Sequence, residues 1–399
     1  MQTLDQEFSV TYRYQVHFTR NLFTDHRNAL LETLRNSARE EPTELLLVID
    51  DGVLEHHPDL PDALRSFARE ESAVTTPGEP IVLPGGERAK NDPDHVRRIH
   101  RAVYDQGLCR HSFVVAIGGG AVLDAAGYAA ATAHRGLRHV RVPTTVLAQN
   151  DSGVGVKNGI NAFRTKNFVG SFAPPDAVFN DATFLTTLED RDWRAGISEA
   201  VKVALLKDPS FYEWLEEEAG RLAPPTRDLD AMERLVHRCA ELHMEHIAGS
   251  GDPFEKGSSR PLDFGHWAAH RLEELTDYRL RHGEAVAIGL ALDVVYSHLE
   301  GRIDEQQADR VLDLFQDLGF DLFVPELTRH LEDPEHPGSI FRGLESFREH
   351  LGGELTIMLL EDVGTGIEVH EVDHALYRDA IARLRETSVS PEPEYGAQA

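Results

Sequence analysis

The sequence predicts an α/β, Rossmann-like N-terminal domain followed by a mostly α-helical C-terminal domain. Apolar segments of strand length, such as 44–53 and 111–118, alternate with helical segments up to about residue 185. This alternation is typical of βαβ units around a parallel sheet. Beyond residue 185, apolar residues recur with helical spacing. We therefore expect domains at 1–185 and 186–385, followed by a flexible tail at 386–399.

The composition is that of a globular protein. Apolar residues make up 41% of the 399 residues, and no apolar run reaches the ~20 residues that a membrane span requires. The N-terminus lacks the pattern of a signal peptide, and the two cysteines are expected to be reduced thiols. These features predict a cytoplasmic protein without a membrane partner.

The net charge of −28 argues against nucleic-acid binding, which needs a basic surface. Only six of the 40 basic residues are lysine, a bias compatible with a salt-adapted host or with codon usage. In such a chain, lysines inside glycine-rich loops stand out, because a flexible ammonium group is well suited to binding phosphate.

A glycine triplet, Gly118–Gly120, ends an apolar strand and opens an alanine-rich helix that carries Asp124. Glycines allow the backbone to approach a diphosphate closely, and the helix N-terminus supplies oriented N–H groups. An ordinary tight turn would use the same residues, and the spacing is not G-x-G-x-x-G. The strand-to-helix context favours a nucleotide site.

Four residues have the types and spacing of a metal site. His266 and His270 are four residues apart and therefore share one helix face. His282 begins the next predicted helix, and Glu199 lies on an earlier one. Three such ligands with an open position describe a catalytic zinc site. Surface histidines are the alternative, because the chain contains 21.

The segment 149–175 is predicted to be a polar loop rich in glycine, asparagine and lysine. It contains Asp151, Lys157, Asn161, Lys166 and Asn167, including two of the six lysines. A solvated surface loop would be the ordinary interpretation. Phosphate recognition by ammonium and amide groups explains the lysines better.

Six motifs in the same order, over about residues 80–290, resemble those of the 3-dehydroquinate synthase family, within the sugar phosphate cyclase superfamily. They are GGGAVLD (118–124), PTTVLAQND (143–151), VKNGINAFRTKN (156–167), SEAVK (198–202), LDFGHWAAH (262–270) and HGEAVAIG (282–289). The resemblance implies a dehydroquinate synthase-like fold, a carbon–oxygen lyase acting on a phosphorylated keto-sugar, NAD and zinc (with cobalt as an alternative) as cofactors, and a homodimer.

The resemblance also assigns roles to individual residues. It assigns the metal to Glu199, His266 and His282. The catalytic positions that it implies are Asp151, Lys157, Lys202, His270, Asn167, Arg135 and Asp263. The NAD contacts that it implies are Asp50, Glu87, Lys90, Gly119, Gly120, Asp124, Thr144, Thr145, Lys157, Lys166, Thr186 and Thr187. His270, Lys157 and Asn167 would contact the substrate phosphate, which Arg135 would reach from a partner subunit.

The implied reaction is a cycle. NAD oxidises a substrate hydroxyl held on zinc, phosphate leaves by β-elimination, the hydride returns, and an intramolecular aldol reaction closes a carbocycle. In this reaction the enzyme mainly holds reactive intermediates in a productive geometry.

Departures from the family pattern bear on the substrate. Asp263 replaces an asparagine, His243 stands near the position of a carboxylate-binding lysine, and Arg260 is shifted by one residue. The segment 347–357 resembles sedoheptulose 7-phosphate cyclases, and the combination of Asp263 with His270 is closest to the EboD-like and 2-epi-valiolone synthase groups. We therefore expect a valiolone-type cyclitol product. The alternatives are 3-dehydroquinate synthase, a metal-dependent alcohol dehydrogenase of the same architecture, and a non-catalytic nucleotide-binding protein.

Overall fold

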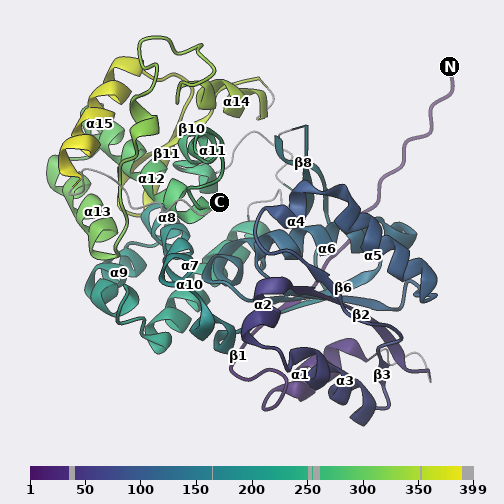
Figure 1. Ribbon diagram of the computed structural model, residues 1–399. Coiled ribbons are helices and arrows are strands. Elements are labelled where there is room, and N and C mark those ends of the chain that lie inside the picture. Colours follow the sequence, from purple (N-terminus) through teal and green to yellow (C-terminus); the bar gives the residue numbers. More distant parts are fainter. Residues whose placement is uncertain (36–40, 164, 250–253, 255–260, 351–352, 389–399) are drawn as a thin grey trace. The chain divides into compact units, whose positions relative to one another are not determined.

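The computed structural model describes residues 1–35, 41–163, 165–249, 254, 261–350 and 353–388 (Figure 1). The chain forms two compact units. The first contains residues 1–144 and 155–184, and the second contains residues 145–154 and those from 185 onward. The last helix, α15 (His374–Thr387), includes the first two residues of the predicted tail, and residues 389–399 lie outside the described part.

The first unit is built on a seven-stranded parallel sheet in the order β1-β9-β6-β5-β2-β3, with β4 also paired to β2. Residues 45–49 of strand β2 are all apolar and buried because helices cover both faces of the sheet. The strands are β1 (Gln15–Thr19), β2 (Thr43–Asp50), β3 (Val74–Thr75), β4 (Ile81–Leu83), β5 (Phe113–Gly118), β6 (Arg138–Pro143) and β9 (Ala177–Asp181).

Helices cover the two faces of this sheet. Figure 1 shows α1 and α3 on one face and α5 and α6 on the other. Leu45, Leu47 and Ile49 alternate along β2 and pack in one apolar cluster with side chains of α1 and α3. The helices of this unit are α1 (Arg27–Leu34), α2 (Asp51–His56), α3 (Leu60–Glu70), α4 (Arg88–Asn91), α5 (Pro93–Asp105) and α6 (Gly120–Thr132).

The polar segment expected as a loop is instead largely an antiparallel hairpin of β7 (Lys157–Ala162) and β8 (Thr165–Phe172). Two glycines face each other across it. A Cβ at Gly170 would lie 2.6 Å from the Asn158 carbonyl oxygen, and one at Gly159 would lie 3.1 Å from the Val169 carbonyl oxygen. The glycines that suggested a loop therefore allow the two strands to approach closely.

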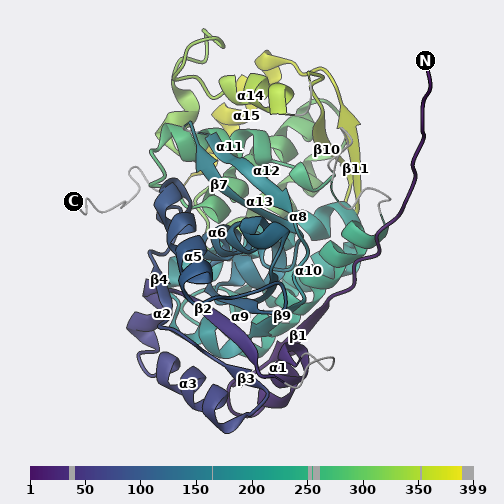
Figure 2. The same ribbon diagram turned by 90° about the vertical axis from the view of Figure 1, so that its right-hand side faces the viewer.

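The second unit is mostly helical, and α12 is its centre. Buried residues follow one another along α12, which packs against α8, α11, α13 and α15 (Figure 2). The helices are α7 (Asp190–Ala195), α8 (Ile197–Lys207), α9 (Pro209–Leu222), α10 (Leu229–Gly249), α11 (His266–Leu275), α12 (His282–Leu299), α13 (Glu305–Asp317), α14 (Arg342–His350) and α15, and the short helical segments are η2 (Ala148–Ser152), η4 (Pro261–Asp263) and η5 (Pro325–Thr328). A small hairpin of β10 (Ile357–Asp362) and β11 (Thr365–Val369) completes the unit.

Residues 145–154, which the sequence suggested as part of the first domain, pack in the second unit. The Asn150 side-chain amide donates to the Gly196 carbonyl oxygen at 2.7 Å. A Cβ at Gly196 would lie 2.3 Å from the Leu147 backbone nitrogen, so only glycine allows this approach. Among the described residues, no helix is both long and apolar enough to span a membrane.

Candidate metal and dinucleotide sites

A buried carboxylate and two imidazoles meet in the second unit. Glu199 lies in the first turn of α8, and His266 and His282 are the first residues of α11 and α12. One ligand atom of each residue lies within 4.8 Å of the other two. Two imidazole nitrogens and one carboxylate oxygen are a donor set typical of catalytic zinc, in which a fourth position stays open.

Hydrogen bonds determine which nitrogen of each imidazole faces Glu199. His266 Nδ1 lies 3.0 Å from the Phe264 carbonyl oxygen, and His282 Nδ1 lies 3.2 Å from Glu273 Oε2. When both Nδ1 atoms carry the proton, both Nε2 atoms offer a lone pair, and each lies 3.5 Å from Glu199 Oε1. Metal-binding histidines are commonly oriented in this way.

Glu199 has the environment of a metal ligand. It is 1% exposed, and neither carboxylate oxygen accepts a hydrogen bond of ordinary geometry from the described residues. Lys202 forms an ion pair with it one turn further along α8. Burial alone would raise the pKa of Glu199, but the charge of Lys202 and the two nearby imidazoles hold it well below its usual range. A buried carboxylate that faces two imidazole nitrogens and accepts no hydrogen bond of ordinary geometry from the described residues fits a bound divalent cation.

Lys202 lies among carboxylates in the same unit. It is 3% exposed, and although burial lowers its pKa, the charges of Glu199, Asp151 and Asp263 raise the pKa above its usual value. Asp151 Oδ1 lies 3.4 Å from His243 Nδ1. Asp151 belongs to η2, a π-helical turn, and such turns are frequent at functional sites. The predicted catalytic residues of this unit are therefore close to the candidate metal ligands.

His270 lies one turn after His266 and is exposed. Its ring centre is 5.4 Å from that of His266 and 5.9 Å from that of His282. With Glu273 and His282 it forms a second candidate metal group, which shares His282 with the first. Because Glu273 hydrogen-bonds to His282, whereas Glu199 faces the Nε2 atoms of both His266 and His282, the first group fits a metal better.

In the first unit, the glycine triplet joins β5 to α6, and Gly119 is the N-cap of α6. The Gly119 N–H lies 3.4 Å from Asp50 Oδ2, and Asp50 also accepts from the Gly52 N–H at 2.9 Å. Burial raises the pKa of Asp50. A Cβ at Gly118 would lie 2.9 Å from the Asp50 Cβ, so this glycine is required for the close approach of the two strand ends.

Predicted NAD and phosphate residues of the first unit form one charged cluster. Lys90 Nζ lies 2.6 Å from Asp124 Oδ2 and also contacts Asn167 Oδ1. Lys166 Nζ lies 3.0 Å from Glu87 Oε1. Burial acts to raise the pKa of Glu87, but the charges of Lys166 and Lys90 lower it. This charged cluster connects α4, α6 and the hairpin of β7 and β8.

The remaining predicted residues are more dispersed. Lys157 is exposed at the start of β7, and Arg135 is exposed after α6 with a φ of +63°. Thr144 is buried, and its N–H donates to the Gly118 carbonyl oxygen at 3.1 Å. Three predicted NAD residues belong to the second unit, namely Thr145, Thr186 and Thr187.

Two residues of interest were missed from the sequence. Glu273, which hydrogen-bonds to His282, lies seven residues after His266 and therefore on the same face of α11. Arg141 is fully buried on β6 and donates to the carbonyl oxygens of Gly155 and Lys157 at 2.9 and 3.1 Å. An arginine between two valines of a predicted strand was the available signal for Arg141.

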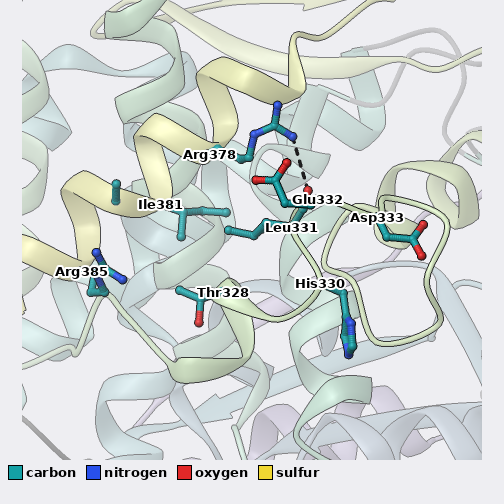
Figure 3. A pocket seen from close by; sticks show the side chains of 9 residues that line it. Thr328, His330, Leu331, Glu332, Asp333, Arg378, Ile381 and Arg385 are labelled. Atoms are coloured by element: carbon teal, nitrogen blue, oxygen red, sulfur yellow. Dashed lines mark hydrogen bonds between the residues drawn. The ribbon is translucent and has the colours of Figure 1, made fainter.

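A separate hollow of about 520 Å³ lies beside α15 (Figure 3). At the edge of this hollow, the Arg378 guanidinium donates a hydrogen bond to the Leu331 carbonyl oxygen, over 3.3 Å. Its lining residues are Thr328, His330, Leu331, Glu332, Asp333, Arg378, Ile381, Ala382 and Arg385. None of these is a predicted site residue, and the lining mixes both charge signs, so we assign it no part in the site.

Comparison with protein families gives two matches that together span residues 80–333. Residues 80–195 match the family model described as 3-dehydroquinate synthase N-terminal, and residues 196–333 match the C-terminal one. A 3-dehydroquinate synthase of Cereibacter sphaeroides is 38% identical over 309 residues, covering 76% of this chain and 81% of the relative. That of Pelobacter propionicus is 42% identical over 252 residues, covering 62% and 68%.

Solved structures include similar folds. ValA, a 2-epi-5-epi-valiolone synthase from Streptomyces hygroscopicus subsp. jinggangensis 5008 with NAD+ and Zn2+ bound, has a TM-score of 0.82 at 27% identity, covering 96% of this chain and 99% of that one. A 2-deoxy-scyllo-inosose synthase has a TM-score of 0.73 at 24% identity, covering 92% and 96%. These similarities confirm the predicted fold class.

Proposed function

Because the chain belongs to the 3-dehydroquinate synthase family, we propose that it is an NAD- and zinc-dependent sugar phosphate cyclase. The proposed enzyme eliminates phosphate from a keto-sugar phosphate and closes a carbocycle. The observation that carries this proposal is the buried group of Glu199, His266 and His282, with Lys202 beside it. The NAD+ and Zn2+ bound in ValA support both cofactors.

The cofactors would be held by residues of the two units. NAD would bind at Gly119 and the charged cluster of the first unit, and bound NAD supplies a reversible hydride acceptor. The metal would be held by Glu199, His266 and His282, and a bound divalent metal supplies a Lewis acid for substrate hydroxyls. Glu273 orients the His282 imidazole for this role.

The chain's own groups then hold charge and protons. The Lys202 ammonium, buried between Glu199 and Asp151, stabilises negative charge that develops on a substrate oxygen. Asp151 Oδ1 and His243 Nδ1, which are 3.4 Å apart, can exchange a proton with the substrate near the Lys202 ammonium. On the strength of the family resemblance, we propose that His270, Lys157 and Asn167 each take part in recognition of the substrate phosphate, and that Arg135 does so from a partner subunit in a homodimer.

The charge balance of the second unit favours a substrate without a carboxylate. In the described part of this site, Lys202 pairs with Glu199, and the negative charges of Asp151 and Asp263 also act on its ammonium group. A bound divalent cation would neutralise the net negative charge of these four groups. No excess positive charge would then remain to bind a carboxylate of the substrate. Burying an unpaired carboxylate costs several kcal/mol. We therefore propose sedoheptulose 7-phosphate as substrate, with a valiolone-type cyclitol as product.

The second candidate is 3-dehydroquinate synthase, whose substrate is carboxylated. The identities of 38% and 42% to curated 3-dehydroquinate synthases favour it. Arg260, which could hold a carboxylate, lies outside the described residues. The substrates of the two candidate enzymes differ at one end, which is carboxylated only in the substrate of 3-dehydroquinate synthase. We propose that this end binds near His243 and Asp263.

The test incubates the metal-loaded protein and NAD with each substrate separately. Phosphate release gives kcat/KM, and mass and NMR spectra identify the ring product. We expect a higher kcat/KM for sedoheptulose 7-phosphate, and a loss of that preference in the Asp263→Asn variant. A higher kcat/KM for the carboxylated precursor of 3-dehydroquinate would establish the second candidate. The His282→Ala variant serves as the inactive control.

A further inference from the structure

Asp293 is a buried carboxylate to which the proposed reaction gives no role. It lies on α12, about three turns after His282, and is fully buried. Its Oδ1 accepts from Trp267 Nε1 at 3.0 Å and from the Tyr377 hydroxyl at 2.8 Å. Its Oδ2 accepts from the Gly265 N–H at 3.1 Å. Both oxygens of this carboxylate are therefore satisfied.

Two of these three donors flank a candidate metal ligand. Gly265 is the N-cap of α11, His266 is its first residue and Trp267 its second. The carboxylate therefore holds the backbone just before His266 and the side chain just after it. Because α12 also begins with His282, Asp293 links the helix that carries one imidazole to the helix that carries the other.

The helix backbones meet at the same place. Gly265 has a φ of +74°, a conformation that favours glycine. A Cβ at Gly289 would lie 2.1 Å from the Gly265 carbonyl oxygen, and one at Gly265 would lie 2.6 Å from the Leu290 backbone nitrogen. The start of α11 thus rests directly on α12. At such close contact, a shift of α11 would move His266 relative to His282.

We propose that Asp293 is a positioning residue for the metal site, which fixes the start of α11 so that His266 and His282 present their nitrogens to one ion. The proposal rests on the proposed function, since it takes Glu199, His266 and His282 as the metal ligands. A merely structural role predicts something different, because loss of Asp293 would then lower stability and leave the metal affinity of the folded protein unchanged.

The Asp293→Asn variant isolates this role. An asparagine offers one acceptor oxygen in place of two, and its amide is a donor. In either orientation of the amide, the Gly265 N–H or the Trp267 indole N–H loses its acceptor, so one bond to α11 is lost. The matched control is Tyr377→Phe, which removes the third hydrogen bond, from α15, and keeps both bonds to α11.

Two measurements on the full chain distinguish the outcomes. Competition for Zn2+ against a chromogenic chelator should show affinity weakened at least about tenfold in Asp293→Asn and unchanged within about twofold in Tyr377→Phe. Hydrogen exchange of the metal-free protein should speed up in the first turn of α11 only in Asp293→Asn. Wild-type Zn2+ affinity in folded Asp293→Asn, or equal losses in both variants, would overturn the proposal.

The Zn2+ affinity of the wild-type protein separates this inference from the proposed function. If the wild-type protein binds no Zn2+, the metal assignment fails and the positioning proposal fails with it, even if exchange responds as expected. If it binds Zn2+ but Asp293→Asn binds equally well, only the positioning proposal fails. Should Asp293→Asn not fold, Trp267→Phe takes its place, because it removes one of the two bonds to α11 while keeping the carboxylate. An unchanged Zn2+ affinity in that variant would then overturn the proposal.

Discussion

Replacing Glu273 with glutamine tests the negative charge of the group that accepts a hydrogen bond from His282. Glu273 is 2% exposed, and its Oε2 lies 3.2 Å from His282 Nδ1. Glutamine can still accept this hydrogen bond, but its neutral amide no longer raises the basicity of the imidazole. Mutation of such a partner weakens metal binding by about 10–100-fold, or about 1.4–2.7 kcal/mol. Because the His282 side chain is 26% exposed, we expect the lower end of this range.

The assay is a Zn2+ competition titration on variants whose circular dichroism matches that of the wild type. The control is Glu274→Gln, which makes the same charge change at the neighbouring residue. Glu274 is 44% exposed and pairs with Arg271 at 2.7 Å. The Zn2+ affinity of the Glu274→Gln protein should therefore stay within about twofold of wild type. Wild-type affinity in Glu273→Gln, or an equal loss in the control, would refute the reasoning.

Three further predictions concern the first unit. Gly119→Val should weaken NAD binding at least about tenfold in calorimetry while Zn2+ binding persists, and an unchanged NAD affinity would exclude the glycine loop as the binding site. Burial, aided by the charge of Arg141, lowers the pKa of His139 to about 3 from 6.5. Between pH 3 and pH 6.5 the unfolded chain therefore binds one proton more than the folded protein. Up to about 5 kcal/mol of the free energy of unfolding, which is fully present above pH 6.5, is lost as the pH falls towards 3. His139→Gln should flatten the dependence of the unfolding free energy on pH, measured by denaturant titrations. An unaltered dependence on pH would refute this prediction. Sedimentation should give a homodimer with Arg135→Ala impaired in turnover, whereas a fully active monomer would exclude its action from a partner subunit.

The parallel sheet was predictable because its signals are local, whereas the grouping of Glu199, His266 and His282 was predicted from the family resemblance. A glycine triplet between an apolar strand and a helix places Gly119 at a helix N-terminus without any long-range information. Helical spacing put His266 on the same helix face as His270 and put His282 at the start of the next helix. The motif order then connected them to Glu199.

Partners far apart in the sequence were not predictable. Asp293 accepts from residues that are 28 positions before it and 84 positions after it, and a single sequence does not report such pairing. The hairpin of β7 and β8 was misread because glycine and asparagine usually indicate a loop, whereas here Gly159 and Gly170 allow two strands to pack closely. Residues 145–154 pack with α8 through Gly196, a contact that only the fold shows.

The most direct test of the central claim follows phosphate and NADH together over many turnovers. A cyclase returns its hydride in every cycle, so the account predicts many equivalents of phosphate per enzyme, a carbocyclic product and no accumulation of NADH at 340 nm, on the order of at most one equivalent per site. Accumulation of one NADH for each substrate consumed, without release of phosphate, would contradict the account and identify a dehydrogenase.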